Sequence, residues 1–147
     1  MLKNFNFKNL KKKNFSGIKL VGYAFRKTNL NQVTFLKSDL EKVDFWNADL
    51  DKTNFREATL NNCILSDTDL TKTIISKTTF LNSNLSHCNL NGLNLKNSTF
   101  KNVNLREATY DDKTIWPKKF DPTLYGAIKL KNKRNKIKNK KSNQFII

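Results

Sequence analysis

Residues 29–60 read NLNQVTFLKSDLEKVDFWNADLDKTNFREATL, and every fifth residue in this stretch is Leu or Phe. The same register runs in both directions, so that each position divisible by five from 5 to 110 is Leu, Phe, Ile or Tyr. A helix would spread such positions around its axis, and a strand would place alternate ones on opposite faces. A strict five-residue period maintained over residues 5–110 predicts instead a solenoid with one structural unit per repeat.

Each five-residue unit has the same internal order around its central residue. Two residues before it stands a small or modest side chain, such as Val33 or Ala48, and the residue directly before it is usually Asn, Asp or Thr, such as Asn29 or Asp49. The two residues that follow are mostly polar. We therefore expect one large inward side chain, one small inward side chain and three outward positions in every unit.

Residues 48–50 (ADL), 28–30 (TNL), 68–70 (TDL) and 103–105 (VNL) resemble the repeat of the pentapeptide-repeat family, which runs Ala-(Asp/Asn)-Leu-x-x. The resemblance covers about residues 18–115. It implies an all-β fold, a right-handed quadrilateral β-helix (a pentapeptide-repeat solenoid) with four pentapeptides in each coil.

The order of the central residues independently favours an even number of sides. Phe and Leu alternate from Phe5 to Leu60, so like residues recur every ten positions and would stack if the coil has four sides. Later units lose Phe from two columns and gain it in a third, at Phe80 and Phe100, as a densely filled interior requires. The column of Leu95 is expected to continue to Ile115. The predicted core consists of Phe25, Leu30, Phe35, Leu40, Phe45, Leu50, Phe55, Leu60, Leu65, Leu70, Ile75, Phe80, Leu85, Leu90, Leu95, Phe100 and Leu105.

Residues 1–17 break the pattern, because Lys3, Lys8 and Lys13 occupy the small inward position. Charged side chains do not enter an apolar core unpaired. Residues 1–17 are therefore either a basic segment outside the regular coils or an atypical first coil whose lysines reach out of its mouth. The second arrangement would protect a sheet edge against end-to-end stacking. Gly17, Gly22 and bulky Tyr23 favour a regular register that settles only afterwards, within a repeat domain of residues 18–115.

The opposite end changes character at residues 110–122, YDDKTIWPKKFDP, which resemble the closing segment of many pentapeptide-repeat proteins of photosynthetic bacteria. Trp116 and Phe120 are expected to fold over the last coil. Asp121 and Pro122 form a favourable start for a short helix, whose apolar face would carry Leu124, Tyr125 and Ile128. The prediction is a cap over residues 116–130, followed by a basic, disordered tail at 131–147.

Few residues of the chain suit catalysis. His87, the one histidine, follows the central Leu85 by two positions and should face water. Cys63 and Cys88 occupy small inward positions on different sides, which favours buried, unpaired thiols. The glycines lack a phosphate-binding spacing. The sequence predicts a protein that is not an enzyme, with no metal and no cofactor.

A binding role remains, and two classes of partner compete. In the first, the β-helix is a rigid interaction scaffold for an unidentified protein, with Trp46 as the best anchor because it follows the central Phe45 and should be exposed. An alternative is that Trp46 packs on a neighbouring coil. A solenoid end offers a further contact, with another copy of the chain.

In the second class, basic ends bind nucleic acid or an anionic membrane surface. The net charge is +16, divided as +5 over residues 1–17, +3 over 18–128 and +8 over 129–147. Some family members imitate DNA and inhibit DNA gyrase, which requires an acidic surface, so this charge disfavours that role. Basic residues of the tail that would make the contact are Lys131, Lys133, Arg134, Lys136, Lys138, Lys140 and Lys141.

The chain has no apolar run long enough to span a bilayer and no apolar segment typical of a secretory signal. We therefore expect a cytoplasmic protein without a transmembrane span.

Overall fold

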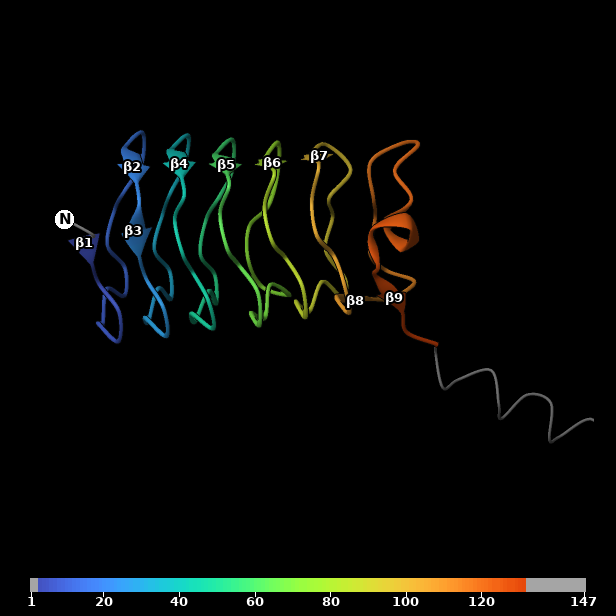
Figure 1. Cartoon of the computed structure of the whole chain (residues 1–147), viewed down its shortest axis with the longest axis horizontal. Coiled ribbons are helices and arrows are strands. Elements are labelled where there is room, and N and C mark those ends of the chain that lie inside the picture. Colours follow the sequence, from blue (N-terminus) through green and yellow to red (C-terminus); the bar gives the residue numbers. More distant parts are fainter. Residues whose placement is uncertain (1–2, 132–147) are drawn as a thin grey trace, which may run out of the picture.

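The computed structural model describes residues 3–131, which wind into a right-handed β-helix with its coils stacked along the long axis (Figure 1). The strands are short and are joined by tight turns. In chain order they are β1 (Lys3–Asn4), β2 (Lys19–Val21), β3 (Tyr23–Ala24), β4 (Asp39–Glu41), β5 (Thr59–Asn61), β6 (Thr79–Leu81), β7 (Thr99–Lys101), β8 (Thr109–Tyr110) and β9 (Ile128–Lys129), with a 3-10 helix, η1 (Pro122–Tyr125), between the last two. The predicted all-β fold is confirmed.

Successive coils pair in parallel with a shift of twenty residues, which is four pentapeptides. The longest sheet has the order β2-β4-β5-β6-β7 and stacks Leu20 on Leu40, Leu40 on Leu60 and Leu60 on Phe80. Isolated bridges with the same shift, such as Asn29 with Asp49, join the coils on the other sides. A four-sided coil is the arrangement that the resemblance implied.

The turn at each corner explains the Asn or Asp that precedes the central residue. In the unit centred on Leu30, the Val33 N–H donates to the Leu30 carbonyl at 2.9 Å, and Gln32 adopts a positive φ of 58°. The Asn29 side-chain oxygen accepts a hydrogen bond from the Asn31 N–H at 3.0 Å. A short amide or carboxylate thus serves a backbone group that the sharp turn leaves without a ladder partner.

Both inward positions fill the core as predicted. Every residue of the predicted core is buried except Phe100, which is half-buried below the closing segment. The small inward residues are also buried, and the Thr53 hydroxyl donates to the Leu30 carbonyl of the preceding coil at 2.8 Å. Rings of the same column stack, with centroids 5.4 Å apart for Phe25 and Phe45. Packing and hydrogen bonding therefore hold neighbouring coils in one register.

The first coil is already in the regular register. Lys3–Asn4 pairs with Tyr23–Ala24, and bridges of the same shift join Asn9 to Asn29 and Asn14 to Thr34. The expectation that the register settles only after Gly17, Gly22 and Tyr23 is wrong. Lys3, Lys8 and Lys13 are accommodated because their side chains turn out of the core and are exposed. Lys3 Nζ lies 4.9 Å from the centre of the Tyr23 ring.

The last coil departs from the twenty-residue shift. Asn94 pairs with Ile115, a shift of twenty-one, and Thr109 pairs with Ile128, a shift of nineteen. The longer step turns Ile115 outward, where it is 49% exposed, and brings Trp116 over the core in its place. The prediction that Ile115 continues the Leu95 column is therefore wrong.

The predicted helix is a single 3-10 turn. Asp121 caps it through a hydrogen bond from the Thr123 N–H, as expected, and Gly126 ends it with a φ of 91°. The expected apolar helix face does not form, because Leu124 is 82% exposed and Ile128 belongs to β9. Trp116 and Phe120 nevertheless cover the last coil, with their ring centroids 5.5 and 5.1 Å from that of Phe100.

Candidate functional site

The two thiols are buried structural groups. Cys63 and Cys88 are free cysteines, and their Sγ atoms donate to the Leu40 and Leu65 carbonyls at 3.3 and 3.1 Å. Burial raises the pKa of Cys63 to about 12 and that of Cys88 to about 11. A nucleophilic cysteine requires a thiolate, so neither side chain is prepared for covalent chemistry near neutral pH.

His87 lies on the surface beside an acid rather than beside a nucleophile. Its Nδ1 atom is 3.3 Å from Glu107, and its side chain is 47% exposed. Within residues 3–131, no group of three or more His, Cys, Asp or Glu side chains could hold a metal ion. The same residues contain no helix long and apolar enough to cross a membrane.

Trp46 is half-buried, and residues of both neighbouring coils hold it. Its indole N–H donates to Asp67 Oδ2 at 2.8 Å, and Lys27 Nζ lies 5.1 Å from the ring centre. The Trp46 backbone N–H donates to Asp44 Oδ1 at 2.9 Å. Trp46 thus combines the two sequence alternatives, since it packs on neighbouring coils and still reaches the surface.

A hollow of about 410 Å³ is lined in part by Asp44, the residue that accepts the Trp46 backbone N–H. Gly22 and Ala24 present little side chain in its lining, and Arg26 and Asp44, which form an ion pair, also line it. Its lining consists of Asn4, Asn6, Gly22, Tyr23, Ala24, Arg26, Lys42, Asp44, Asn62 and Ile64. We name Arg26, Lys27, Trp46 and Asp67, together with this hollow, the Trp46 surface.

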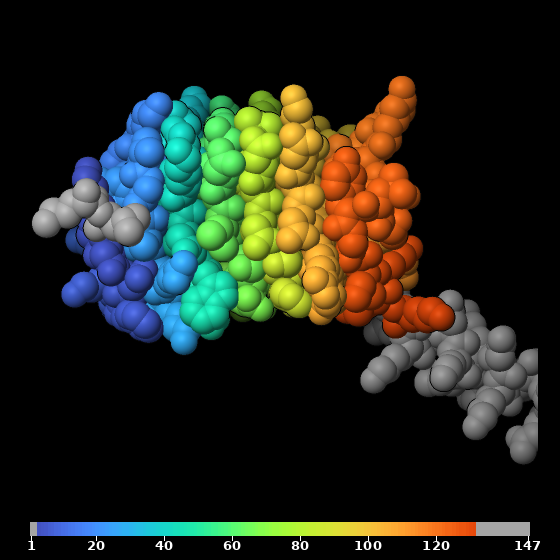
Figure 2. Space-filling view, viewed as in Figure 1, coloured from blue at the N-terminus to red at the C-terminus, as the bar shows by residue number. Residues whose placement is uncertain are grey.

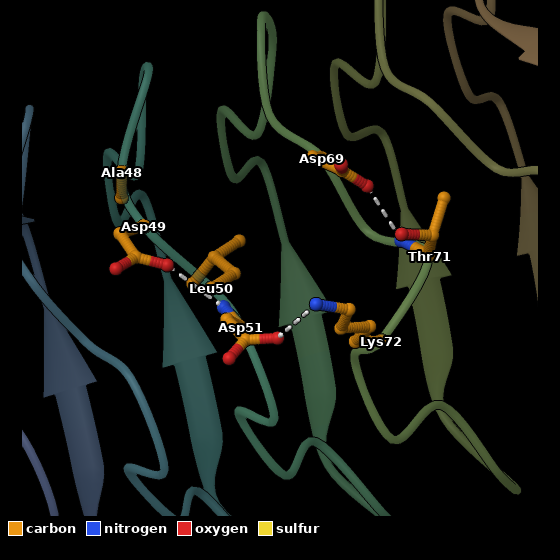
Figure 3. Close-up of a pocket in the computed structure, with 7 residues that line it drawn as sticks. All are labelled: Ala48, Asp49, Leu50, Asp51, Asp69, Thr71 and Lys72. Carbon is orange, nitrogen blue, oxygen red and sulfur yellow. Dashed lines mark hydrogen bonds and ion pairs between the residues drawn. The ribbon is translucent and has the colours of Figure 1, made fainter.

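A second hollow, of about 170 Å³, carries three carboxylates on another side of the coil (Figure 3). Asp49 and Asp69 each accept the N–H of the residue two positions on, at 3.0 and 2.9 Å. Asp51 lies 3.7 Å from Lys72 Nζ and accepts from the Asn31 amide at 2.8 Å. All three carboxylates therefore take part in turns or pairs.

The predicted basic residues of the tail lie mostly beyond the described part of the chain. Lys131 is exposed, whereas Lys133, Arg134, Lys136, Lys138, Lys140 and Lys141 lie outside the described residues. The sequence did not single out Phe7, which is 74% exposed. The available signal was a Phe at an outward position that is Lys, Asn, Asp or another polar residue in most units.

Comparison with known proteins identifies a family whose sequence model matches this chain. The family described as Pentapeptide repeats matches the chain in eight copies, over residues 9–47, 38–76 and 80–109. No curated protein matches the chain.

Three solved structures are similar. The pentapeptide repeat protein Rfr23 of the cyanobacterium Cyanothece 51142 is 22% identical, with 74% of this chain and 90% of that chain covered and a TM-score of 0.61. A pentapeptide repeat protein of Nostoc is 20% identical, with 88% and 86% covered and a TM-score of 0.40. One from the thylakoid lumen of Arabidopsis thaliana is 27% identical, with 80% and 73% covered and a TM-score of 0.39.

Proposed function

Since the chain belongs to the pentapeptide-repeat family, we propose that it acts without catalysis, as a rigid scaffold that binds a partner protein through the Trp46 surface. The observation that carries the proposal is the fixed orientation of Trp46. Its ring is held between Lys27 of one neighbouring coil and Asp67 of the other. A preordered aromatic loses little conformational entropy when a partner covers it.

The chemistry of the described residues supports a role in binding. The two thiols are buried and protonated at neutral pH, and the carboxylates of Figure 3 are used in turns and pairs. The outward side chains, in contrast, are displayed at regular intervals of about 4.8 Å between successive coils. Such spacing suits recognition of an extended partner surface.

The free state of Cys63 and Cys88 fits a reducing compartment, and we propose a cytoplasmic location on this basis. Fractionation of the source cell tests this location directly, and recovery of the protein outside the cytoplasmic fraction would contradict it.

The binding test uses the full chain as bait in an extract of its own cell, followed by binding measurements with each purified protein that it retains. Trp46→Ala should weaken the true partner roughly tenfold or more, as expected for a central aromatic anchor. Leu36→Ala is the matched control, because Leu36 occupies the same position of its unit on a different side of the coil and is also half-buried. Equal affinity of wild type and Trp46→Ala for every retained protein would refute the proposal.

A further inference from the structure

The outer face of the first coil differs in chemistry from the coil below it. Its four small inward positions hold Lys3, Lys8, Lys13 and Ile18, and all four side chains are exposed. The corresponding positions of the second coil are Tyr23, Thr28, Val33 and Ser38, which are buried or half-buried. Inside this ring, Phe5, Leu10 and Phe15 are only partly buried. The first coil, drawn in dark blue in Figure 2, lies at one end of the rod. This end therefore has an apolar centre with a basic rim.

The lysines of this rim lack the compensation that other basic residues near it receive. Lys19 pairs with Asp39 and Lys37 with Glu57, each exactly one coil further along the chain, and Arg26 pairs with Asp44. The same twenty-residue step from Lys8, Lys11, Lys12 and Lys13 leads to Thr28, Asn31, Gln32 and Val33, which are all neutral.

Moreover, residues 1–38 contain no acid. Among residues 3–131, no ion pair involves Lys8, Lys11, Lys12 or Lys13. The residues of the second coil at the facing positions carry no charge. These four lysines are therefore available to an external anion.

Phe7 adds an apolar group beside the lysines at a cost to the backbone. It is 74% exposed and has a φ of 60°, a left-handed conformation that bulky side chains rarely adopt. The equivalent residues of the next two coils are Lys27 and Asn47, which suit an exposed turn better. Ile18 and Val21, also on the first coil, are 37% and 48% exposed. The fold gains little from displaying these side chains to water.

From this combination we propose that the first coil binds the surface of an anionic lipid bilayer. Lys8, Lys11, Lys12 and Lys13 contact the headgroups, while Phe7 and Ile18 enter the boundary between headgroups and acyl chains. Burial of apolar side chains and attraction of lysines to anionic lipids both strengthen peripheral attachment to a membrane. Nucleic acid would match the charge but offers no apolar layer for Phe7 and Ile18, and a second copy of the same face would oppose lysine to lysine.

The residues proposed to contact the bilayer are different from Arg26, Lys27, Trp46 and Asp67, although Asn4 and Asn6 of the first coil line the hollow of the Trp46 surface. The test is flotation of the purified full chain with vesicles of phosphatidylcholine alone or mixed with phosphatidylserine. The protein should float only with the anionic vesicles, and binding should fall as salt is raised because the charges are screened. No partner protein is present, so the result is independent of the proposal for Trp46.

Two sets of four substitutions distinguish the effect of the first-coil lysines from the effect of the total charge of the chain. Vesicle affinity should fall roughly a hundredfold in the variant that combines Lys8→Gln, Lys11→Gln, Lys12→Gln and Lys13→Gln, since each basic residue near the surface contributes severalfold. The control variant loses the same charge from exposed positions on the body, through Lys52→Gln, Lys77→Gln, Lys96→Gln and Lys101→Gln. Its vesicle affinity should change less than about fivefold.

Phe7→Asn reproduces the residue of an equivalent turn and tests the apolar contact without endangering the fold. It should lower vesicle affinity roughly tenfold while leaving the thermal midpoint unchanged or higher. A full chain whose seven basic residues at 131–141 are changed to Gln reports the contribution of the tail and should still float when the first coil is intact.

The proposal is overturned if the four first-coil substitutions leave flotation unchanged, or if only the tail substitutions abolish it. It is also overturned if the chain ignores anionic vesicles but binds a DNA duplex, or forms a dimer, in a way that depends on the same four lysines.

Discussion

The first coil and the closing segment finish the same β-helix with different chemistry. At the C-terminal end, backbone groups of the last coil are paired by the closing segment, as where the Leu105 N–H donates to the Tyr125 carbonyl at 3.1 Å and Glu107 to Gly126 at 2.9 Å. Trp116 then covers the core, with its ring centroid 5.6 Å from that of Tyr110. Figure 1 shows this segment, in orange, lying across the end of the stack.

At the N-terminal end, none of the described residues plays that part. Phe5, Leu10 and Phe15 are half-buried, and lysines surround them. The comparison teaches that stacked coils can be terminated by aromatic cover or by charge. Aromatic cover excludes water and completes the core, whereas charge opposes the stacking of another sheet edge on the exposed end.

The largest contrast between the ends should appear when one aromatic residue is removed from each. Trp116→Ala should lower the free energy of unfolding by about 3 kcal/mol, because it opens the cover over the core. Phe5→Ala should cost about 1–2 kcal/mol, because its ring packs on the coil below and is otherwise partly exposed. Urea unfolding measures both, and equal losses would show that the closing segment is no better a cover than the first coil.

Glycines sharpen the comparison at the level of the backbone. A Cβ on Gly126 would lie 2.9 Å from the Arg106 Cα, whereas one on Gly17 would meet nothing within 4 Å. Both residues have positive φ, so each change to Ala carries conformational strain of about 1 kcal/mol. Gly126→Ala should cost about 2–3 kcal/mol in total, because backbone must also move. A difference in thermal midpoint tests this, and similar midpoints would contradict close packing at Gly126.

Two buried thiols in the interior between the ends should make the stability of the fold fall at alkaline pH. The pKa values of Cys63 and Cys88 are raised in the folded protein, to about 12 and about 11, from an ordinary value of 9.0. The stability that they contribute is fully present below pH 9.0 and is lost as the pH rises through these values.

Cys63→Thr with Cys88→Thr is the control for this pH dependence. Thr occupies equivalent positions, and the Thr53 hydroxyl makes the same hydrogen bond to the preceding coil. Thermal midpoints across the alkaline range should fall more steeply for wild type than for the double variant, and parallel curves would exclude thiol ionisation as a cause.

Of the changes considered, Phe7→Asn should alter the stability of the fold the least. Relief of the left-handed backbone should stabilise the fold by a few tenths of a kcal/mol at most, roughly offset by loss of the weak contacts that the ring makes. A clear drop in thermal midpoint would mean that Phe7 supports the first coil, which would weaken the contrast between a covered end and a displayed one.

The regular part of the fold was predictable because each unit repeats the same local rule. Leu30 and Phe35 are buried, Asn29 closes its turn, and the inward Thr53 hydroxyl finds a carbonyl of the preceding coil, all in agreement with the five-residue order. Ile115 was misplaced because the rule assumes a constant shift, and a shift of twenty-one at Asn94 exchanges it with Trp116. The helix expected after Asp121 is limited to the 3-10 turn η1 for a related reason, since Ile128 and Lys129 form β9 and pair with β8.

The candidate surfaces were less predictable than the core. The repeat placed Trp46 outward, but only the stacking of coils brought Asp67 to its indole and Lys27 to its ring. Those neighbours are about one coil away in the sequence, so their contact depends on side-chain conformations that the repeat does not specify.

By itself, the sequence determined which side chains enter the core, because burial of one large and one small residue per unit is a local and periodic requirement. It also determined the excess of lysine near the first coil. Only the tertiary structure decided that Lys8, Lys11, Lys12 and Lys13 stand over neutral residues of the second coil while Lys19 and Lys37 meet acids. The physical reason is that charge compensation acts between coils, so it depends on which residues the twenty-residue step brings together.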